Sequence, residues 1–344
     1  MTKFAIDLLE YYDRRKRLLP WRTDPTPYHV WLSEVMLQQT RVEKVKPFYF
    51  AFLFSFPSIK SLSEAPEEEV LKKWEGLGYY SRARNLKKGA EYVMKEFGGE
   101  LPSSKDQLLK IPGIGEYTAS SISAMAFDLP EIALDGNLLR IFARFGATAR
   151  SYDDPQVKKD AFDFYKRHLP SSRCGDFNQA LMELGETICL PNGRPQCEIC
   201  PFADDCLAHR GGKEALFPLP KAQKERKKVS LNVFLFLHQG KVVIRRRGEK
   251  GLLQGAYEFP NCPSEVSCEE ALKLYRVTGD LRPLGKGKHR FSHLEWEMSW
   301  HLVECENPPK GEGLILVDIP SLHSKYMLPN AFTNFCKKKG ILGY

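Results

Sequence analysis

The chain has 344 residues, of which 42% are hydrophobic and 12% aromatic, enough to form hydrophobic cores in two or three domains. No run of about 18 apolar residues occurs, which excludes a membrane span, and residues 1–21 lack the apolar centre of a signal peptide. We therefore expect an intracellular, cytoplasmic protein. The formal net charge of +8 indicates a polyanionic partner, most often nucleic acid.

Helical patterns dominate the first part of the chain, residues 1–212. The segment WLSEVMLQQT, residues 31–40, predicts one helix, and residues 60–78 predict another that begins with acidic side chains and stops at a glycine. Shorter helices are predicted at residues 103–110, 116–127 and 178–188. This part of the chain is therefore expected to be all-α.

Glu34 lies in the middle of the first of these predicted helices. Its neighbours three and four residues away are Val30, Trp31, Leu37 and Gln38, so no lysine or arginine pairs with it locally. A carboxylate in such surroundings is costly to bury without a partner. Either this helical face is exposed to water, or the acid is retained for chemistry.

A glycine-rich turn, PGIG, joins the predicted helices at 103–110 and 116–127. Gly113 and Gly115 allow the backbone to approach a ligand, and the following helix offers free N–H groups, which suits a DNA phosphate backbone. A tight helix connection is the simpler interpretation of the turn alone. Asp135 comes later, just before a further helical segment, where helix capping is its simplest role.

Four cysteines, Cys189, Cys197, Cys200 and Cys206, are separated by seven, two and five residues. Such clustering is typical of a shared metal centre. Two kinds of centre remain open, a zinc ion held by four thiolates and a [4Fe–4S] cluster. Zinc ribbons usually use two CxxC pairs, whereas this segment has one, so the spacing favours the iron–sulfur cluster.

The composition changes at residues 213–229, where two prolines and a dense basic run predict an interdomain linker. Beyond it, residues 231–247 predict two strands around a Gln-Gly turn. Two further strands are predicted at residues 293–304 and 313–318. We therefore predict a multi-domain protein in which an all-α domain, residues 1–212, precedes an α+β domain, residues 230–344.

Together these parts resemble the helix-hairpin-helix DNA glycosylase superfamily and, within it, the adenine DNA glycosylases of the MutY type. The resemblance covers nearly the whole chain and rests on the segments LPWR, WLSEVMLQQTRV, GLGYYSRARNL, PGIGEYTA, DGN, LMELG and the later FSH. It implies a helix-hairpin-helix glycosylase domain with an iron–sulfur cluster loop, followed by a Nudix-like domain. One departure is that the family usually has six residues between its first two cluster cysteines, whereas this chain has seven.

The resemblance implies an enzyme that flips adenine, mispaired with 8-oxoguanine or guanine, out of the duplex and hydrolyses its N-glycosidic bond. Glu34 matches the family's general acid, which protonates adenine N7 and needs a raised pKa. Asp135 matches the carboxylate that stays ionised and stabilises the oxocarbenium-like sugar. Asn137 matches a residue that orients the site, and Tyr117 matches a supporting tyrosine. The endonuclease III branch has a catalytic lysine at the position of Tyr117, so a monofunctional glycosylase with little lyase activity is expected.

Other residues match the family's substrate contacts. Arg22 and Glu183 match residues that line the adenine pocket. Gln39 and Tyr79 match residues that wedge into the duplex around the lesion pair and offset the cost of unstacking it.

The resemblance also implies roles for the C-terminal domain. Contact with 8-oxoguanine is expected from Ser292 and its neighbours Phe291 and His293. An active Nudix enzyme would need an REx2EExG helix after the segment GLLQGAYEFP. Only Glu269 and Glu270 are present there, without the arginine, spacing or final glycine, so no pyrophosphatase activity is expected.

The expected partner is therefore double-stranded DNA with 8-oxoguanine:adenine mispairs, and the expected cofactor is a [4Fe–4S] cluster. We expect a monomer without membrane association, located in the cytoplasm at the nucleoid. Three alternatives remain: a bifunctional endonuclease III-like glycosylase and lyase for damaged pyrimidines, a metal-bearing DNA-binding protein without catalysis, and a nucleotide pyrophosphatase. Tyr117 argues against the first, the pair of Glu34 and Asp135 against the second, and the missing carboxylate motif against the third.

Overall fold

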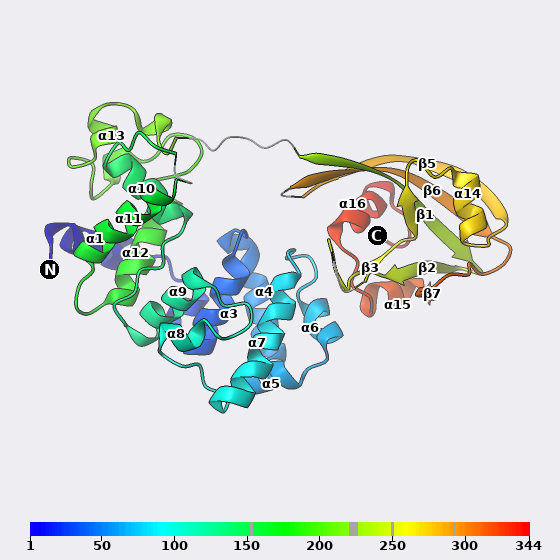
Figure 1. The fold of residues 1–344 in the computed structure, drawn as a ribbon, viewed down its shortest axis with the longest axis horizontal. Coiled ribbons are helices and arrows are strands. Elements are labelled where there is room, and N and C mark those ends of the chain that lie inside the picture. Colours follow the sequence, from blue (N-terminus) through cyan, green and yellow to red (C-terminus); the bar gives the residue numbers. More distant parts are fainter. Residues whose placement is uncertain (152–153, 220–225, 249–250, 292) are drawn as a thin grey trace. The chain divides into compact units, whose positions relative to one another are not determined.

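The computed structural model describes residues 1–151, 154–219, 226–248, 251–291 and 293–344 (Figure 1). The chain forms two compact units. The helical unit comprises Met1–Ala65 and Arg84–Gln223, and the sheet unit comprises Pro66–Ala83 and Lys224–Tyr344. The expected order of an all-α region followed by an α+β region is confirmed. No helix in the described ranges is both long and apolar enough to cross a membrane.

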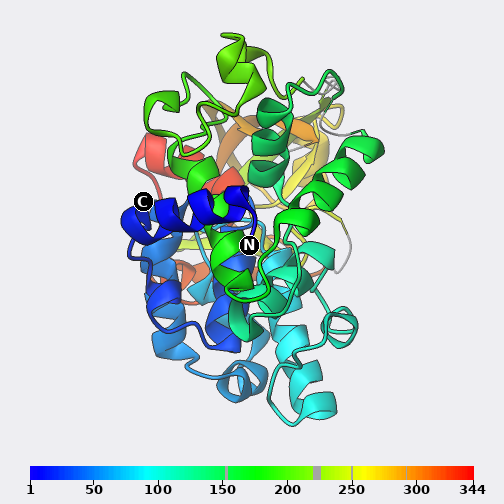
Figure 2. The ribbon, with the colours of Figure 1, turned by 90° about the vertical axis from the view of Figure 1, so that its left-hand side faces the viewer.

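The helical unit contains most of the helices: α1 (Lys3–Arg15), α2 (Pro20–Thr23), α3 (Pro27–Leu37), α4 (Val42–Ser55), α5 (Ile59–Glu64), most of α7 (Ser81–Phe97), α8 (Lys105–Leu108), α9 (Glu116–Phe127), α10 (Gly136–Phe145), α11 (Pro155–His168), α12 (Cys174–Thr187) and α13 (Leu207–Arg210), with the 3-10 turns η1 (Cys197–Ile199) and η2 (Glu214–Leu216). Helix α12 is central, because it packs against α1, α9 and α10 (Figure 2). Its apolar face, Ala180, Leu181, Leu184 and Ile188, is buried in the core, as the spacing predicts.

The predicted helix at residues 60–78 is wrong, because the segment forms two helices. Helix α5 ends at Glu64, and α6 (Glu67–Lys73) begins after Pro66. Proline restricts the preceding residue to extended conformations and lacks the N–H that a continuous helix needs, which explains the break. Ala65 accordingly has φ −68° and ψ 144°.

The sheet unit contains α6, β1 (Lys227–His238), β2 (Lys241–Arg246), β3 (Tyr257–Glu258), β4 (Asn261–Pro263), α14 (Cys268–Leu274), β5 (Gly279–Arg290), β6 (Leu294–Cys305), β7 (Leu314–Asp318), α15 (Ile319–Ser324) and α16 (Asn330–Lys339). The strand order is β3-β2-β1-β6-β5, with β4 also beside β1 and β7 beside β2. Strands β1 and β6 are parallel, and the other pairs are antiparallel.

Both faces of the sheet are covered. Val233 and Leu235 of β1 join one core with Phe332 of α16, whereas Phe234 and Phe236 join a second core with side chains of α14. Successive side chains of a strand point to opposite faces, so a continuous apolar run is what a doubly covered strand requires.

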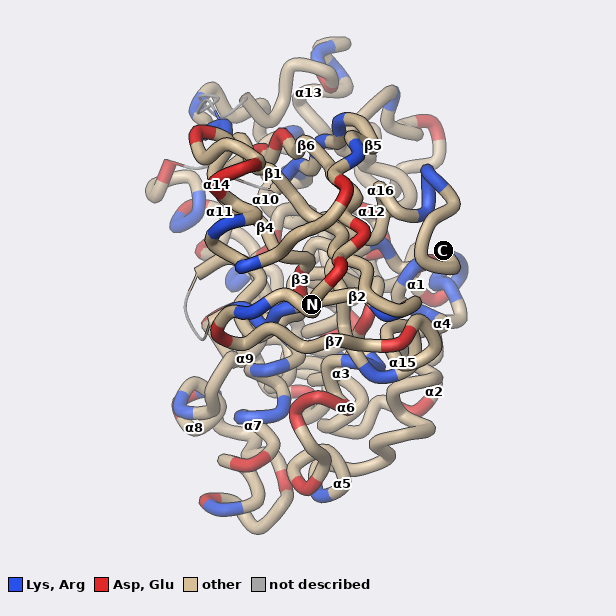
Figure 3. Tube along the Cα trace, turned by 90° about the vertical axis from the view of Figure 1, so that its right-hand side faces the viewer, with Lys and Arg blue, Asp and Glu red and all other residues tan. Residues whose placement is uncertain are grey.

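Strand β5 was not expected, because Pro283, Gly285 and the basic residues around them are unusual in a strand. The position of β5 at the edge of the sheet explains this composition. An edge strand tolerates the missing backbone N–H of Pro283 and the bulge between Pro283 and Gly285. Acidic and basic residues are interspersed over this unit (Figure 3), and exposed pairs such as Lys288 Nζ to Glu297 Oε1, 2.6 Å apart, cross from β5 to β6.

The predicted linker, residues 213–229, is partly structured. Its start includes η2, and β1 begins at Lys227, before the predicted end of the linker. Residues 220–225 lie outside the described residues. The sheet unit also includes Pro66–Ala83, a segment that the sequence placed in the first domain.

Candidate active site

Glu34 is buried on α3, with 5% of its surface exposed. Helix α3 packs against α9, and the hydroxyls of Tyr117 and Ser121, one turn apart on α9, lie near enough to the Glu34 carboxyl to affect its pKa. Glu34 Oε2 has no hydrogen-bond partner among the described residues. The face of α3 that carries Glu34 is therefore not exposed to water, and one carboxyl oxygen is left unsatisfied.

This environment favours a protonated Glu34. Burial raises the pKa of its carboxyl, the neighbouring hydroxyls of Tyr117 and Ser121 oppose the rise, and the carboxylates of Asp135 and Glu186 add to it. Burial and the neighbouring Glu34 carboxylate also raise the pKa of Tyr117 well above its ordinary value, so its hydroxyl keeps its proton. Glu34, Tyr117 and Asp135 thus share one electrostatic environment, which the sequence could only suggest.

Asp135 is the N-cap residue of α10, so it has the helix-capping role that its position in the sequence suggests. Its Oδ1 accepts from the Leu138 amide at 2.9 Å, and its Oδ2 accepts from Asn137 Nδ2 at 2.8 Å. Burial raises the pKa of Asp135, and these hydrogen bonds oppose the rise. Both oxygens of Asp135 therefore have donors, an arrangement that suits an anion, whereas Glu34 has an oxygen with none.

A chain of hydrogen bonds runs from Asp135 to the cysteine segment. Asn137 Oδ1 accepts from Arg140 Nη2 at 2.7 Å, and Arg140 Nε donates to the Cys189 carbonyl at 2.7 Å. Arg140 Nη2 also donates to the Gly185 carbonyl at 2.7 Å. A Cβ on Gly185 would lie 2.5 Å from Asn137 Cβ, so the glycine of the LMELG segment lets α12 approach α10 closely.

A small cavity of about 40 Å³ lies beside Glu34 and is called the base cavity below. Its lining comes from α2, α3, α9 and α12 and includes Trp21, Arg22, Glu34, Met125, Gln179 and Met182. The structure thus brings Arg22 and Glu34 together, as expected.

Glu183 is not part of the cavity lining but lies beneath it, with its side chain fully buried. It accepts from Arg17 Nε at 2.6 Å and from Arg22 Nη1 at 2.8 Å. Burial raises the pKa of Glu183, but the hydrogen bonds and charges of the two arginines outweigh it and lower that pKa overall. Glu183 therefore positions Arg22 rather than lining the cavity itself.

Sequence reasoning missed several lining residues, chiefly Gln179, Met182 and Glu186 of α12. A signal was present, because these residues and Glu183 recur three or four positions apart on one helix. They form a polar and methionine stripe beside the apolar face of α12. Ser121 was missed as well, although it lies one turn after Tyr117.

The glycines of the PGIG turn serve different purposes. Gly113 has φ +84°, and a Cβ there would lie 2.6 Å from Asn85 Cβ, so the chain's own packing requires it. Gly115, the N-cap residue of α9, has an ordinary φ of −99°, and a Cβ there would meet nothing. Gly115 therefore leaves open space in front of the N-terminus of α9, where a phosphate could bind.

The two predicted wedge residues have similar local structures. Gln39, at the end of α3, is exposed and has φ +55°. Tyr79, in the sheet unit, has 47% of its surface exposed and φ +50°. Both therefore stand in the left-handed region that non-glycine residues rarely adopt, which is frequent at binding sites.

Phe291 and His293 lie in the turn between β5 and β6. The Phe291 amide donates to the Leu294 carbonyl at 2.8 Å, and its ring packs edge-on against Trp296 at 4.9 Å. His293 is exposed. Ser292, the expected contact with 8-oxoguanine, lies outside the described residues.

The two glutamates after the Nudix-like segment are on α14. Glu270 accepts from the amide and hydroxyl of Ser267 at 2.9 Å and completes a capping box. Glu269 is exposed at the same helix start. The Glu270 carboxylate thus has a structural partner at the start of its helix.

The four predicted metal ligands, Cys189, Cys197, Cys200 and Cys206, line one apolar cavity. Burial raises the pKa of Cys200 to about 12, and the charges of the other three thiolates add to the rise, so the four sulfurs are close neighbours. Arg144 Nη1 donates to Cys189 Sγ at 3.3 Å and supplies a positive charge to the site.

The thiols are nevertheless too widely spaced for one zinc ion. Among the described residues, the single set of three potential ligand atoms within 4.8 Å of one another is Cys197, His209 and Glu214. Zn–S bonds of about 2.3 Å would place tetrahedral sulfurs about 3.8 Å apart. A larger cluster held by four thiolates therefore fits this donor set better than zinc does.

Two family models match the chain. Residues 32–166 match the HhH-GPD superfamily of base excision DNA repair proteins, and residues 232–338 match the NUDIX domain. The helix-hairpin-helix and Nudix-like assignments made from the sequence are thereby confirmed.

Curated relatives and solved structures agree with these models. Adenine DNA glycosylase of Mus musculus is 34% identical over 371 residues, covering 90% of this chain and 72% of the relative. That of Rattus norvegicus is 42% identical over 357 residues, covering 86% and 69%. That of Buchnera aphidicola (subsp. Acyrthosiphon pisum) is 32% identical over 298 residues, covering 86% and 85%.

Among solved structures, a thermostable thymine-DNA glycosylase has a TM-score of 0.56 and 27% identity, over 60% of this chain and 95% of that one. A trapped endonuclease III–DNA covalent intermediate has a TM-score of 0.52 and 22% identity, over 60% and 94%, and supports the fold alone. The relatives match most of both chains at more than 30% identity. The chain therefore belongs to the adenine DNA glycosylase family and is a glycosylase of base excision DNA repair.

Proposed function

We propose that the protein excises adenine mispaired with 8-oxoguanine or guanine in double-stranded DNA, by hydrolysing the N-glycosidic bond. The observation that carries this proposal is the buried Glu34 carboxyl, with one oxygen lacking a partner, in the same electrostatic environment as Tyr117 and Asp135. The relatives named adenine DNA glycosylase support the choice of base.

In this mechanism the two carboxyl groups have different protonation states. Glu34 enters the reaction protonated and delivers its proton to adenine N7, which makes the base a better leaving group. Asp135 remains ionised, because both of its oxygens accept hydrogen bonds, and stabilises the positive charge that develops on the sugar. Asn137 fixes the Asp135 carboxylate, and Arg22 contributes to the wall of the base cavity.

DNA binding uses the exposed turns. Gly115 and the N-terminus of α9 hold a backbone phosphate, while Gln39 and Tyr79 insert beside the lesion pair. In the sheet unit, Phe291, Ser292 and His293 contact the 8-oxoguanine. These residues contact three different parts of the DNA: the backbone, the stacked bases and the lesion. Loss of any one of these contacts should therefore weaken DNA binding without changing the rate of bond cleavage.

The cysteine site is proposed to hold a [4Fe–4S] cluster through Cys189, Cys197, Cys200 and Cys206. When bound, the cluster cross-links these cysteines and stabilises the segment between them. Arg144 and Arg140 then connect this segment to α10, which carries Asp135 at its start.

A single-turnover assay on a duplex with one 8-oxoguanine:adenine pair tests the proposal. We expect an abasic strand that breaks only after alkali treatment, because Tyr117 stands where a lyase has lysine. A matched duplex with cytosine opposite 8-oxoguanine should remain intact. Strand breakage without alkali would favour the bifunctional alternative, and an unreacted adenine strand would favour a DNA-binding protein without catalysis.

A further inference from the structure

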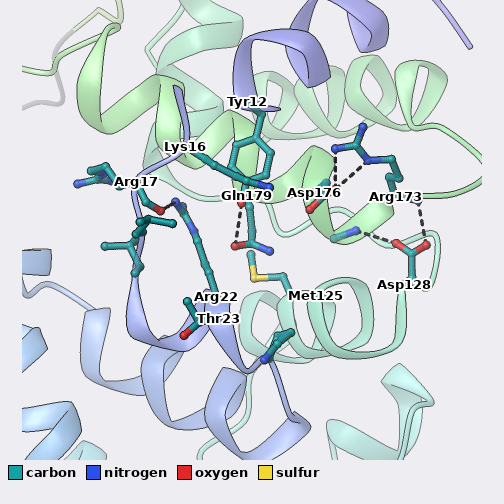
Figure 4. A pocket seen from close by; sticks show the side chains of 14 residues that line it. Tyr12, Lys16, Arg17, Arg22, Thr23, Met125, Asp128, Arg173, Asp176 and Gln179 are labelled. Atoms are coloured by element: carbon teal, nitrogen blue, oxygen red, sulfur yellow. Dashed lines mark hydrogen bonds and ion pairs between the residues drawn. The ribbon is translucent and has the colours of Figure 1, made fainter. Parts of the chain in front are cut away.

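A second, larger cavity lies directly behind the base cavity in the helical unit. Its volume is about 370 Å³, and it is called the rear chamber below (Figure 4). Tyr12 and Lys16 of α1, Thr23 of α2, and Asp176 of α12 contribute to its lining. None of these residues lines the base cavity.

The two cavities share a thin wall of side chains. Residues that line both are Arg17, Leu19, Arg22, Pro25, Met125 and Gln179. The base cavity, at about 40 Å³, has roughly a tenth of the volume of the rear chamber, at about 370 Å³. A base that passes from the smaller cavity to the larger one must displace part of this wall.

The parts of the wall differ in how firmly they are held. Arg17 and Arg22 are fixed by charged hydrogen bonds to the buried Glu183, at 2.6 and 2.8 Å. Such pairs are costly to break. Gln179 is half-buried and accepts from the Tyr12 hydroxyl at 3.2 Å, and Met125 Sδ accepts from Ser121 Oγ at 3.4 Å.

The movable part of the wall is therefore Met125 with Gln179. Methionine is unbranched and adapts its shape readily, and a neutral hydrogen bond of 3.2 Å costs little to exchange. Figure 4 shows both side chains at the centre of the chamber wall, between Arg22 and the Arg173–Asp176 pair.

We propose that the rear chamber is a second binding site for the excised purine base, and its route out of the protein. This inference rests on the function proposed above. After the bond breaks, the abasic sugar and its DNA stay on the Glu34 and Asp135 side, and the base passes Met125 and Gln179 into the chamber. The amide of Gln179 can both donate to and accept from a purine edge on either side of the wall.

The chemistry of the chamber suits a neutral aromatic base better than a phosphate. Arg17 and Arg22 are already paired with Glu183, and Arg173 is paired with Asp176 at 2.8 Å. The positive charge near these groups is therefore largely neutralised. Tyr12 contributes a flat aromatic ring to this lining, and Lys16 Nζ and the Arg22 guanidinium lie 5.2 and 5.5 Å from the centre of that ring.

The test blocks the chamber without touching the base cavity. Lys16→Trp places a ring over Tyr12, and Arg15→Trp, the adjacent exposed position on the same helix end, loses the same charge and serves as control. The full-length proteins are given a duplex with radiolabelled adenine opposite 8-oxoguanine. The amount of alkali-labile strand measures cleavage of the N-glycosidic bond. Filtration that retains protein-bound label measures how fast the cleaved base leaves the protein.

Wild type and Arg15→Trp should release adenine as fast as the bond is cleaved. Lys16→Trp should cleave within about twofold of wild type but release adenine about tenfold more slowly, because exit becomes limiting. Thr23→Trp narrows the chamber from α2 and should slow adenine release in the same way. It replaces Lys16→Trp as the test if that variant does not fold. Release at the wild-type rate from a folded, blocked variant would overturn the proposal, whereas absent cleavage by wild type would instead reject the proposed function.

Discussion

Two buried glutamates in neighbouring layers of the helical unit have opposite environments. Glu34, in the wall of the base cavity, has an oxygen without a partner among the residues that the structure describes, and burial raises its pKa. Glu183, just below, accepts hydrogen bonds from Arg17 and Arg22, which lower its pKa. Both side chains are almost completely buried, so burial alone does not separate a reactive acid from a structural one.

The difference lies in the donors that surround each carboxyl group. A buried carboxylate with charged donors is stabilised as an anion, whereas one with neutral donors and a free oxygen is stabilised as an acid. The first arrangement holds Arg17 and Arg22 in place, and the second prepares a proton for transfer. Five predictions test this contrast.

The largest effect is expected from Glu34→Gln. This variant keeps the shape of the side chain but cannot deliver the proton, so the single-turnover excision rate should fall by about 10²–10⁴-fold. Binding to the 8-oxoguanine:adenine duplex, measured by fluorescence anisotropy, should change by less than about twofold. A variant that excises adenine at the wild-type rate would show that Glu34 is not the acid.

Glu183→Gln should chiefly reduce stability. It leaves Arg17 and Arg22 without their buried anion, and the free energy of unfolding in urea should fall by about 3–5 kcal/mol. Glu186→Gln is the matched control, because Glu186 also pairs with Arg17 but is 36% exposed, so its loss should cost less than about 1 kcal/mol.

The stability that Glu183 provides should depend on pH. The pKa of Glu183 is lowered, so its contribution to stability is present above the ordinary value of 4.5 and is lost as the pH falls through the lowered pKa. Glu183→Gln should therefore lose less stability on acidification than wild type does. Equal losses in the two proteins would contradict the assignment.

Glu34→Gln should have the opposite effect on stability and raise it. At pH 8 it removes a buried carboxylate with an unsatisfied oxygen, and the gain should be about 1–3 kcal/mol. Because the pKa of Glu34 is raised, its penalty grows as the pH rises above the ordinary value of 4.5 and is complete above the raised pKa. The gain should therefore vanish below the ordinary value of 4.5, which thermal unfolding at a series of pH values can measure.

The smallest effect concerns the neutral donors of Glu34. Excision should fall by about tenfold per pH unit above the raised pKa, because only protonated Glu34 acts. The Ser121 hydroxyl near Glu34 opposes the rise of its pKa, so Ser121→Ala should move this fall to higher pH by less than about one unit. A shift to lower pH in single-turnover rates would contradict this effect of Ser121 on Glu34.

Much of this molecule could be predicted from local patterns. Helical patterns located α3 and α9, and apolar spacing located α12, because a half-buried helix shows its buried face every three to four residues. The two apolar runs on either side of the Gln-Gly turn located β1 and β2. Strand β5 was missed because an edge strand needs neither an apolar face nor a complete set of donors.

By itself, the sequence determined which chemical groups are available and on which helices they lie: an acid without a local partner on α3, an aspartate that caps α10, and a glutamate within α12. Only the tertiary structure decided which of these acids receives charged donors. Arg22 and Glu183 are 161 positions apart, and Glu34 meets Tyr117 and Ser121 only because α3 packs on α9. The protonation of a buried carboxyl depends on such through-space neighbours, and helical periodicity carries no information about them.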